Sequence, residues 1–178
     1  MYYGIYEKSQ SESIIQLFTH TFTDSEGPNE GQIIGNLVSE LLESTSEEDL
    51  FVFVAMDKDA IIGSILFTRL NFESGKTAFL MAPVAVSTQA QGKGVGQALI
   101  KSGLERLAQL GVDIAFTYGD PNFYSKTGFE CITEQMFKAP LPLSYPHGWM
   151  AQSLTGQPLE AISGDSHCVE AFNKPELW

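Results

Sequence analysis

Residues 84–100 read VAVSTQAQGKGVGQALI. An apolar run that ends at Val86 leads into three alternating glycines, Gly92, Gly94 and Gly96, and then into an apolar helical pattern. The first turn of a helix has unpaired backbone N–H groups and a partial positive charge. Glycines remove the side chains that would hold an anion away from those groups. The stretch therefore predicts a strand, a phosphate-binding loop and a helix, in that order.

Two common phosphate-binding motifs do not fit this loop. A P-loop needs GxxxxGK[ST], whereas Lys93 is followed by Gly94 and Val95. A Rossmann fingerprint needs GxGxxG, and Gln97 stands at the position of its last glycine. A third pattern, Q/R-x-x-G-x-G/A, is matched by Gln91, Gly94 and Gly96. The loop therefore favours a different kind of phosphate site from either nucleotide motif.

The segments on either side of the loop predict a strand–helix–strand crossover. An apolar stripe predicts a helix over Gly94–Leu110, and Gly111 stands where a C-terminal cap is expected. Strands are expected before it, over Ala78–Val86, and after it, over Val112–Tyr118. Because Pro83 cannot donate a backbone hydrogen bond, it predicts a bulge or a local splay of the sheet.

The rest of the chain predicts a mixed α+β fold. The first helix is expected to be capped by Ser9 or Ser11, and a Gly27–Pro28 break separates it from the second. Beyond Phe129 the pattern weakens. The expected elements are a strand over Tyr2–Tyr6, helices around 14–22 and 33–42, a hairpin of Leu50–Met56 with Ala60–Leu70, and late strands over Trp149–Leu154 and Cys168–Phe172.

A second motif follows the predicted crossover. Residues 120–129 read DPNFYSKTGF and contain the pattern Tyr-x-x-x-Gly-Phe at Tyr124, Gly128 and Phe129. The two motifs together, in this order, resemble the GNAT N-acetyltransferase superfamily. The resemblance implies a mixed, mostly antiparallel central sheet flanked by helices, with a splayed strand pair. It also implies an acetyltransferase domain over residues 1–155 and an irregular C-terminal extension, 156–178, packed on the same domain.

The resemblance also implies a coenzyme and the residues that hold it. The expected cosubstrate is acetyl-coenzyme A, the acyl donor, with no metal. Its pyrophosphate is expected on the glycine loop and its pantetheine arm along the preceding strand. The implied coenzyme-binding residues are Ala85, Val86, Gln91, Gly92, Lys93, Gly94, Val95 and Gly96.

The activity implied by the resemblance is acyl transfer to a primary amine by direct attack in a ternary complex. Tyr124 matches the family's general acid, and the alternative is an aromatic packing residue at a helix end. Asp120 is a second catalytic candidate, as the base, beside His147. Thr117 stands where many relatives carry asparagine, and no glutamate lies on Ala78–Val86. A non-catalytic acyl-CoA-binding sensor or interaction module remains the alternative function.

The charge distribution restricts the partners. The chain has 178 residues and a formal net charge of −12. Residues 1–50 carry ten acidic side chains and one basic one, whereas residues 51–130 carry seven of each. A nucleic-acid-binding protein needs a dense basic footprint, which is absent here. The acidic segment favours either a cationic acceptor amine or simply a solvated acidic surface.

Cysteine usage and the N-terminal sequence predict the compartment. Only Cys131 and Cys168 occur, without metal-ligand spacing, which is typical of thiols in a reducing cytosol. The start, MYYGIYEKSQ, has no signal-peptide pattern, and the uncharged stretch Ala139–Leu159 contains four prolines that argue against a membrane span. We therefore expect a cytoplasmic protein without membrane or nucleic-acid partners, either a monomer or a homodimer.

Overall fold

The computed structural model describes all residues, Met1–Trp178. The chain divides into two compact units, each made of two segments. The first unit comprises Met1–Phe67 and Pro83–Gly103, and the second comprises Thr68–Ala82 and Leu104–Trp178.

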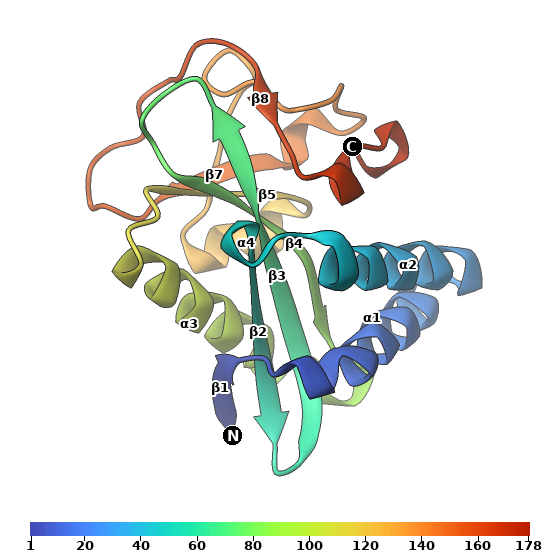
Figure 1. The fold of residues 1–178 in the computed structure, drawn as a ribbon. Coiled ribbons are helices and arrows are strands. Elements are labelled where there is room, and N and C mark those ends of the chain that lie inside the picture. The colour runs from blue at the N-terminus through green and yellow to red at the C-terminus, as the bar shows by residue number, and fades with distance from the viewer. The chain divides into compact units, whose positions relative to one another are not determined.

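Two helices of the first unit, α1 (Ser11–Glu26) and α2 (Pro28–Ser44), lie side by side (Figure 1). Each buries an apolar stripe, with Ile14 and Phe18 in α1 and Val38 and Leu41 in α2 fully inaccessible to solvent. The two helices approach closely because α2 presents glycine there. A Cβ atom on Gly35 would collide with the hydroxyl of Thr19 in α1.

The predicted break between these helices is confirmed, but the predicted serine cap is wrong. Gly27 has φ 98° and Pro28 begins α2. At the start of α1 the N-cap is Gln10, and Ser11 already has helical angles of φ −53° and ψ −48°. A short 3₁₀ turn over Lys8–Gln10 precedes α1 and has its own capping box. Because this turn continues directly into α1, no serine is needed as a cap.

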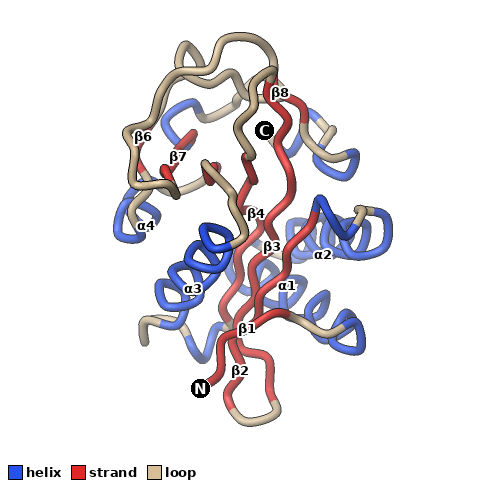
Figure 2. The backbone as a smooth tube through the Cα atoms, turned by 60° about the vertical axis from the view of Figure 1, so that its left-hand side comes forward, coloured by secondary structure: helices blue, strands red, loops and turns tan.

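The strands of the first unit form an antiparallel group. Strand β1 (Tyr2–Ile5) pairs with β2 (Leu50–Asp57), in register from Tyr2 with Met56 to Ile5 with Phe53. Strands β2 and β3 (Ala60–Phe72) form the predicted hairpin, visible beside β1 in Figure 2. The turn between them places Lys58 at φ 56°, an uncommon angle for a residue with a side chain. Strand β4 (Ala78–Val86) is the next neighbour of β3.

The predicted crossover is confirmed. Strand β4 pairs in parallel with β5 (Ile114–Tyr118), from Ala78 with Ile114 to Met81 with Thr117. The ladder therefore ends two residues before Pro83, as the missing N–H of proline predicts. Helix α3 (Val95–Gln109) connects the two strands. It ends at Gln109. Gly111, two residues later, has φ 88°, and the Val112 N–H donates to the Leu107 carbonyl oxygen at 3.0 Å.

The remaining strands of the second unit are short. Strand β7 (Trp149–Ser153), at the predicted position, pairs antiparallel with β5 and with β6 (Glu130–Cys131). The predicted strand over Cys168–Phe172 is wrong. The last strand, β8 (Ser166–His167), pairs with the end of β3, and Glu170–Phe172 forms a 3₁₀ turn. Ala171 and Phe172 are buried in that turn, so these apolar residues indicate a packed turn and not a strand.

Aromatic side chains fill the core of the second unit. Phe116 on β5 stacks on Trp149 with ring centroids 5.2 Å apart, and Phe137 meets Phe116 edge-on at 5.2 Å. The last residue, Trp178, is 4% exposed and lies 6.1 Å from Trp149. Its indole N–H donates to the Phe172 carbonyl oxygen at 2.8 Å. Trp178 is thus part of this core. The expected boundary between an acetyltransferase domain and a C-terminal extension at residue 155 stays a prediction.

The predicted fold class is confirmed as a mixed, mostly antiparallel open sheet with helices. The strand order is β1-β2-β3-β4-β5-β7-β6, and the residues of β3 and β4 are divided between the two units. None of the helices combines the length and the apolar character that crossing a bilayer requires.

Candidate functional site

The glycine loop has a backbone that other residues adopt only with strain. Gly92 has φ 76° and Gly94 has φ 81°, both in the left-handed region. No atom lies within 4 Å of the position that a Cβ atom would occupy at either glycine. The two glycines are therefore required by the backbone angles, and they leave open space on the side where a side chain would project.

Unpaired amides follow the loop at the start of α3. The first hydrogen bond into this helix runs from the Ala98 N–H to the Gly94 carbonyl oxygen at 3.1 Å. The N–H groups of Val95, Gly96 and Gln97 precede that bond and therefore have no intrahelical acceptor. Val95 is 5% exposed, so its side chain anchors the helix start in the core. Lys93 is exposed beside them. This arrangement is suited to binding an anion.

Gln91 ties the other end of the loop to the strand. Its side-chain Nε2 donates to the Val86 carbonyl oxygen, the last of β4, at 2.9 Å. Its backbone N–H donates to the Thr88 carbonyl oxygen at 3.4 Å, so this amide is already used within the turn. Ala85 is buried and Val86 half-buried. The structure thus places all eight predicted coenzyme residues in one continuous strand, loop and helix start.

The second motif folds as a short helix with a cap at each end. Helix α4 (Pro121–Tyr124) begins after Asp120, whose Oδ1 accepts from the Asn122 N–H at 3.0 Å. The turn that continues it ends at Gly128, with φ 98°. Phe129 then enters the core with 3% of its surface exposed. Asp120 therefore has a structural role that its Asp-Pro context anticipates.

The Tyr124 ring is closely enclosed by Phe123, Phe129 and Gly119, which together form the Tyr124 seat. Its ring lies nearly perpendicular to the rings of Phe123 and Phe129, with centroids 5.2 and 6.1 Å away. A Cβ atom on Gly119 would stand 2.8 Å from the Tyr124 ring, so only glycine fits there. Burial, and next the Asp120 carboxylate, raise the pKa of Tyr124 to about 12. The phenol therefore stays protonated and can donate a proton at neutral pH.

Thr117 is a neighbour of Tyr124 that the sequence motifs did not identify. It is 1% exposed, and its hydroxyl donates to the Met81 carbonyl oxygen at 2.8 Å. A side-chain hydrogen bond with Thr117 partly offsets the rise in the Tyr124 pKa. From the sequence, position 117 was only a departure from the family pattern, because the contact forms between a strand and a later helix.

The remaining predicted candidate, His147, directly precedes Gly148, whose carbonyl oxygen accepts from the Gly119 N–H at 3.1 Å. His147 is exposed on a 3₁₀ turn, with its ring 5.8 Å from that of Tyr145. No three His, Cys, Asp or Glu side chains lie close enough together to hold a metal ion. The glycine loop belongs to the first unit and the Tyr124 seat to the second, and each has its own defined geometry.

Comparisons with known proteins agree with these two motifs. A family model described as an acetyltransferase (GNAT) domain matches residues 48–131, which contain both. An uncharacterised N-acetyltransferase of Escherichia coli strain K12, YjhQ, is 34% identical over 174 residues, covering 94% of this chain and 92% of that protein.

Solved structures share the fold. The Escherichia coli GNAT family N-acetyltransferase YhbS, in complex with CoA, superposes with a TM-score of 0.79 at 24% identity, covering 97% of this chain and 92% of that one. An aminoglycoside 6'-N-acetyltransferase complexed with coenzyme A superposes with a TM-score of 0.65 at 14% identity, covering 89% of this chain and 99% of that one.

Proposed function

Because this chain belongs to the GNAT acetyltransferase family, we propose that it transfers an acetyl group from acetyl-coenzyme A to a primary amine within a ternary complex. The proposal rests mainly on one observation: both motifs are present, one with free amide groups that can bind an anion and the other with a group that can donate a proton. The glycine loop leaves amides free at the start of α3, and Tyr124 is held as a protonated phenol. Simple coenzyme binding would not require a proton donor.

The coenzyme proposal assigns one task to each part of the loop. The amides of Val95 and Gly96 donate to the pyrophosphate, and Lys93 adds a positive charge nearby. The end of β4 at Ala85 and Val86 lines the pantetheine arm. Helix-start amides stabilise an anion by about 0.3–1 kcal/mol through the helix dipole, before direct hydrogen bonds are counted.

The proposed reaction has a balanced sequence of bonds. The neutral amine nitrogen attacks the thioester carbonyl carbon, a C–N bond forms, and the C–S bond breaks. The Tyr124 hydroxyl gives its proton to the departing thiolate, and the amine loses a proton to solvent or to a base. Holding both substrates in one complex supplies much of the acceleration, because the attack becomes intramolecular in effect.

Replacing Tyr124 tests the proposal. Tyr124→Phe keeps the ring in its seat and removes the proton donor, so kcat should fall about 10²–10⁴-fold, the usual contribution of general acid catalysis. The KM for acetyl-coenzyme A should stay unchanged. The measurement is release of free coenzyme A thiol with a panel of amines. Tyr2→Phe, on exposed β1, is the matched control and should keep full turnover.

Two other results would contradict the proposal. Unchanged turnover in Tyr124→Phe would leave Tyr124 as a packing residue. A wild-type protein that binds coenzyme A but releases no thiol with any amine would instead be an acyl-CoA sensor or interaction module on the same fold.

The acceptor is proposed to be a cationic amine, small or peptide-borne, met in the cytoplasm by a monomer or homodimer. Two features support this. The segment 1–50 is strongly acidic, and one protein of the same fold is an aminoglycoside acetyltransferase. A protonated amine is attracted by such a surface before it loses its proton and reacts.

A further inference from the structure

Thr117 has one hydroxyl proton and two neighbours that can accept it. The residue lies on β5 opposite Met81 on β4, in the last pair of that parallel ladder, and is 1% exposed. Its hydroxyl donates to the Met81 carbonyl oxygen at 2.8 Å. The Tyr124 hydroxyl is its second hydrogen-bond partner, and all three residues belong to the second unit. A buried threonine is thus placed between a neutral carbonyl oxygen and the proposed proton donor.

The direction of the two hydrogen bonds follows from the number of protons. A hydroxyl group donates one proton and has two lone pairs that accept. Because the Thr117 proton points to the Met81 carbonyl oxygen, the Thr117 oxygen can only accept from the neutral phenol. While Tyr124 is protonated, its O–H group therefore donates to Thr117 Oγ1. The phenol is held at one end of a short chain of hydrogen bonds whose other end is the backbone of β4.

This direction cannot persist once Tyr124 has lost its proton. A phenolate oxygen only accepts, so the Thr117 oxygen would face it with a lone pair unless its own proton turned. A rotation about the Cβ–Oγ1 bond of Thr117 moves only that hydrogen and leaves the side chain in place. A hydrogen bond to a charged oxygen is roughly twice as strong as one between neutral groups. The phenolate therefore competes successfully with the Met81 carbonyl oxygen for the Thr117 proton.

The surroundings of Tyr124 make this hydrogen bond important. Burial, and next the Asp120 carboxylate, raise the pKa of Tyr124, whereas the hydrogen bond with Thr117 lowers it. Phe123 and Phe129, whose rings enclose that of Tyr124, are apolar and offer the phenolate oxygen no side-chain donor. Thr117 is therefore the side chain that makes the anionic form of Tyr124 less costly.

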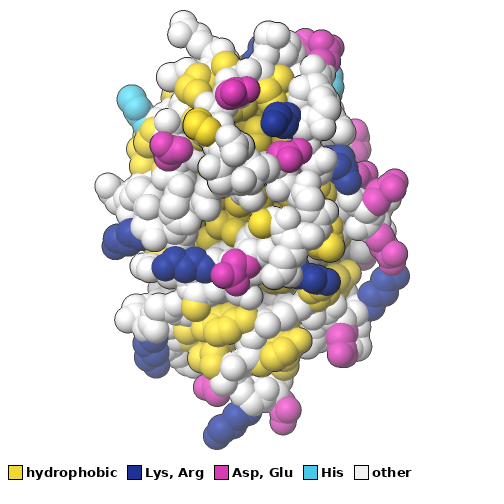
Figure 3. Space-filling model, turned by 90° about the vertical axis from the view of Figure 1, so that its left-hand side faces the viewer, with side chains coloured by type: hydrophobic (Ala, Val, Ile, Leu, Met, Phe, Trp, Pro, Cys, Tyr) yellow, Lys and Arg dark blue, Asp and Glu magenta, His cyan; other side chains and the backbone are white.

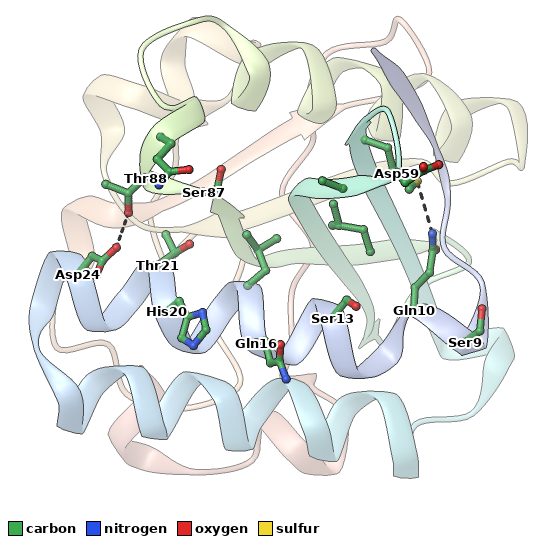
Figure 4. A pocket seen from close by; sticks show the side chains of 15 residues that line it. Ser9, Gln10, Ser13, Gln16, His20, Thr21, Asp24, Asp59, Ser87 and Thr88 are labelled. Carbon is green, nitrogen blue, oxygen red and sulfur yellow. Dashed lines mark hydrogen bonds between the residues drawn. The ribbon is translucent and has the colours of Figure 1, made fainter.

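A threonine that bonds an anionic oxygen also occurs in the first unit. In the groove beside α1, the Thr88 hydroxyl donates to Asp24 Oδ2 at 2.7 Å (Figure 4). The bond from Thr117 to a phenolate oxygen would have the same donor and the same acceptor charge. Thr88 is exposed, so water competes for its bond, whereas Thr117 is buried. The buried bond is expected to be the stronger of the two, because the local dielectric constant is lower.

We propose that Thr117 is a positioning residue whose hydroxyl changes acceptor: it donates to the Met81 carbonyl oxygen while Tyr124 is a phenol, and to the Tyr124 oxygen once Tyr124 is a phenolate. The kinetic part of the proposal rests on the proposed acyl transfer, in which the Tyr124 O–H bond breaks as an S–H bond forms on the leaving thiolate. As the phenol proton turns from Thr117 to the sulfur, the Thr117 proton turns to the phenolate. Thr117 keeps its own proton throughout, and the phenolate regains one from solvent.

Titration of Tyr124 in the protein without substrates tests the proposal. Incorporation of 3-fluorotyrosine lowers phenol pKa values, so the titration needs less alkaline conditions. Fluorine NMR then observes the six tyrosines, and the Tyr124 resonance is the one missing from Tyr124→Phe. Thr117→Val has a similar shape but no hydroxyl, so the Tyr124 pKa should rise by about one pH unit relative to the wild type. Thr117→Ser keeps the hydroxyl and should titrate as the wild type does.

Two further threonine-to-valine variants separate the hydroxyl from looser packing. Thr127→Val removes a hydrogen bond, also 2.8 Å long, to the Tyr124 carbonyl oxygen and leaves the phenol with its partner. Thr88→Val removes the hydroxyl that donates to Asp24. The Tyr124 pKa should keep its wild-type value in both. An equal rise in Thr127→Val and Thr117→Val, or no rise in Thr117→Val, would overturn the proposal.

Turnover separates this proposal from that of acyl transfer. Thr117→Val should lower kcat about three- to tenfold, because a weaker acid gives up its proton less readily, while the KM for acetyl-coenzyme A stays unchanged. In the Tyr124→Phe background the same substitution should have no further effect, and an additive loss would overturn the role of Thr117. A pKa rise in Thr117→Val, with unchanged turnover in Tyr124→Phe, would support the change of acceptor and contradict Tyr124 as the general acid. An unchanged pKa in Thr117→Val, with lost turnover in Tyr124→Phe, would contradict only the role of Thr117.

Discussion

Tyr124 shows how its neighbours set the chemistry of one side chain. Gly119 leaves room for the ring, Phe123 and Phe129 hold its edges, and Thr117 bonds its hydroxyl. Asp120 acts on it through charge while capping α4. We therefore propose that Asp120 supports the protonated state of Tyr124, in place of the predicted role as a base for the amine.

The raised pKa of Tyr124 predicts a pH dependence of stability. Its folded-state pKa, about 12, lies above the ordinary value of 10.0. The neutral phenol is the favoured form in the fold, so its contribution to stability is complete below about pH 10 and is lost as the pH rises toward 12. Alkaline denaturation, followed by circular dichroism, should show this loss in the wild type and not in Tyr124→Phe.

Asp120→Asn tests the effect of the Asp120 charge on Tyr124 while keeping the helix cap, because asparagine also caps helices well. Removing the charge should shift the phenolate absorbance titration of Tyr124 to lower pH, while turnover falls by less than about tenfold, since no proton-transfer group is lost. A loss of turnover as large as that of Tyr124→Phe would restore Asp120 as a catalytic base.

At the scale of elements, α3 lies between two glycines in the left-handed region. Gly94, with φ 81°, precedes it, and Gly111, with φ 88°, follows it, and neither has an atom near the position of a Cβ. The two positions impose the same backbone requirement. Only the first adjoins unpaired amide groups, whereas the second adjoins carbonyl groups.

Alanine at these positions should separate stability from binding. Gly94→Ala and Gly111→Ala should each lower the free energy of unfolding by about 1 kcal/mol, because an L side chain is strained at these angles. Only Gly94→Ala should weaken coenzyme A binding, since the strain shifts the amides that follow. Chemical denaturation and calorimetry measure the two effects. Equal coenzyme affinity in both variants would show that the loop is not part of the binding site.

The elements differ in how well the sequence predicts them. Helix α3 and the parallel pair β4–β5 were predictable because a long apolar stripe, Gly111 and Pro83 are all local signals. The strand predicted at 168–172 failed because apolar residues in a buried turn resemble a short strand. The contact between Thr117 and Tyr124 was not predictable, because it forms between a strand and a later helix.

At the scale of the whole molecule, the charge is uneven along the chain. Residues 1–50 account for most of the net charge of −12. The face shown in Figure 3 carries basic and acidic side chains interspersed, without a single large block of either sign. The KM for a charged acceptor should therefore depend on the acidic segment and less on the rest of the chain.

Salt should test that attraction. Raising the ionic strength screens exposed charges beyond about 10 Å at 0.1 M salt, so the KM for a cationic acceptor should rise several-fold while that for a neutral amine stays constant. Replacing Glu43 and Glu47 by glutamine should reduce this salt dependence, with the neutral amine as the control. If neither the salt nor the two substitutions changed the KM for the cationic acceptor, the acidic segment would be only a solvated surface.

The two cysteines make the molecule selectively labelable. Cys131 is exposed on the two-residue strand β6, whereas Cys168 is partly covered and burial raises the pKa of its thiol. Thiolates are the reactive species, so an alkylating fluorophore at neutral pH should attach at Cys131 first. A reagent that measures released coenzyme A will also consume this thiol. Cys131→Ser would therefore give turnover assays a low background, while the native chain offers one position for a fluorescent reporter.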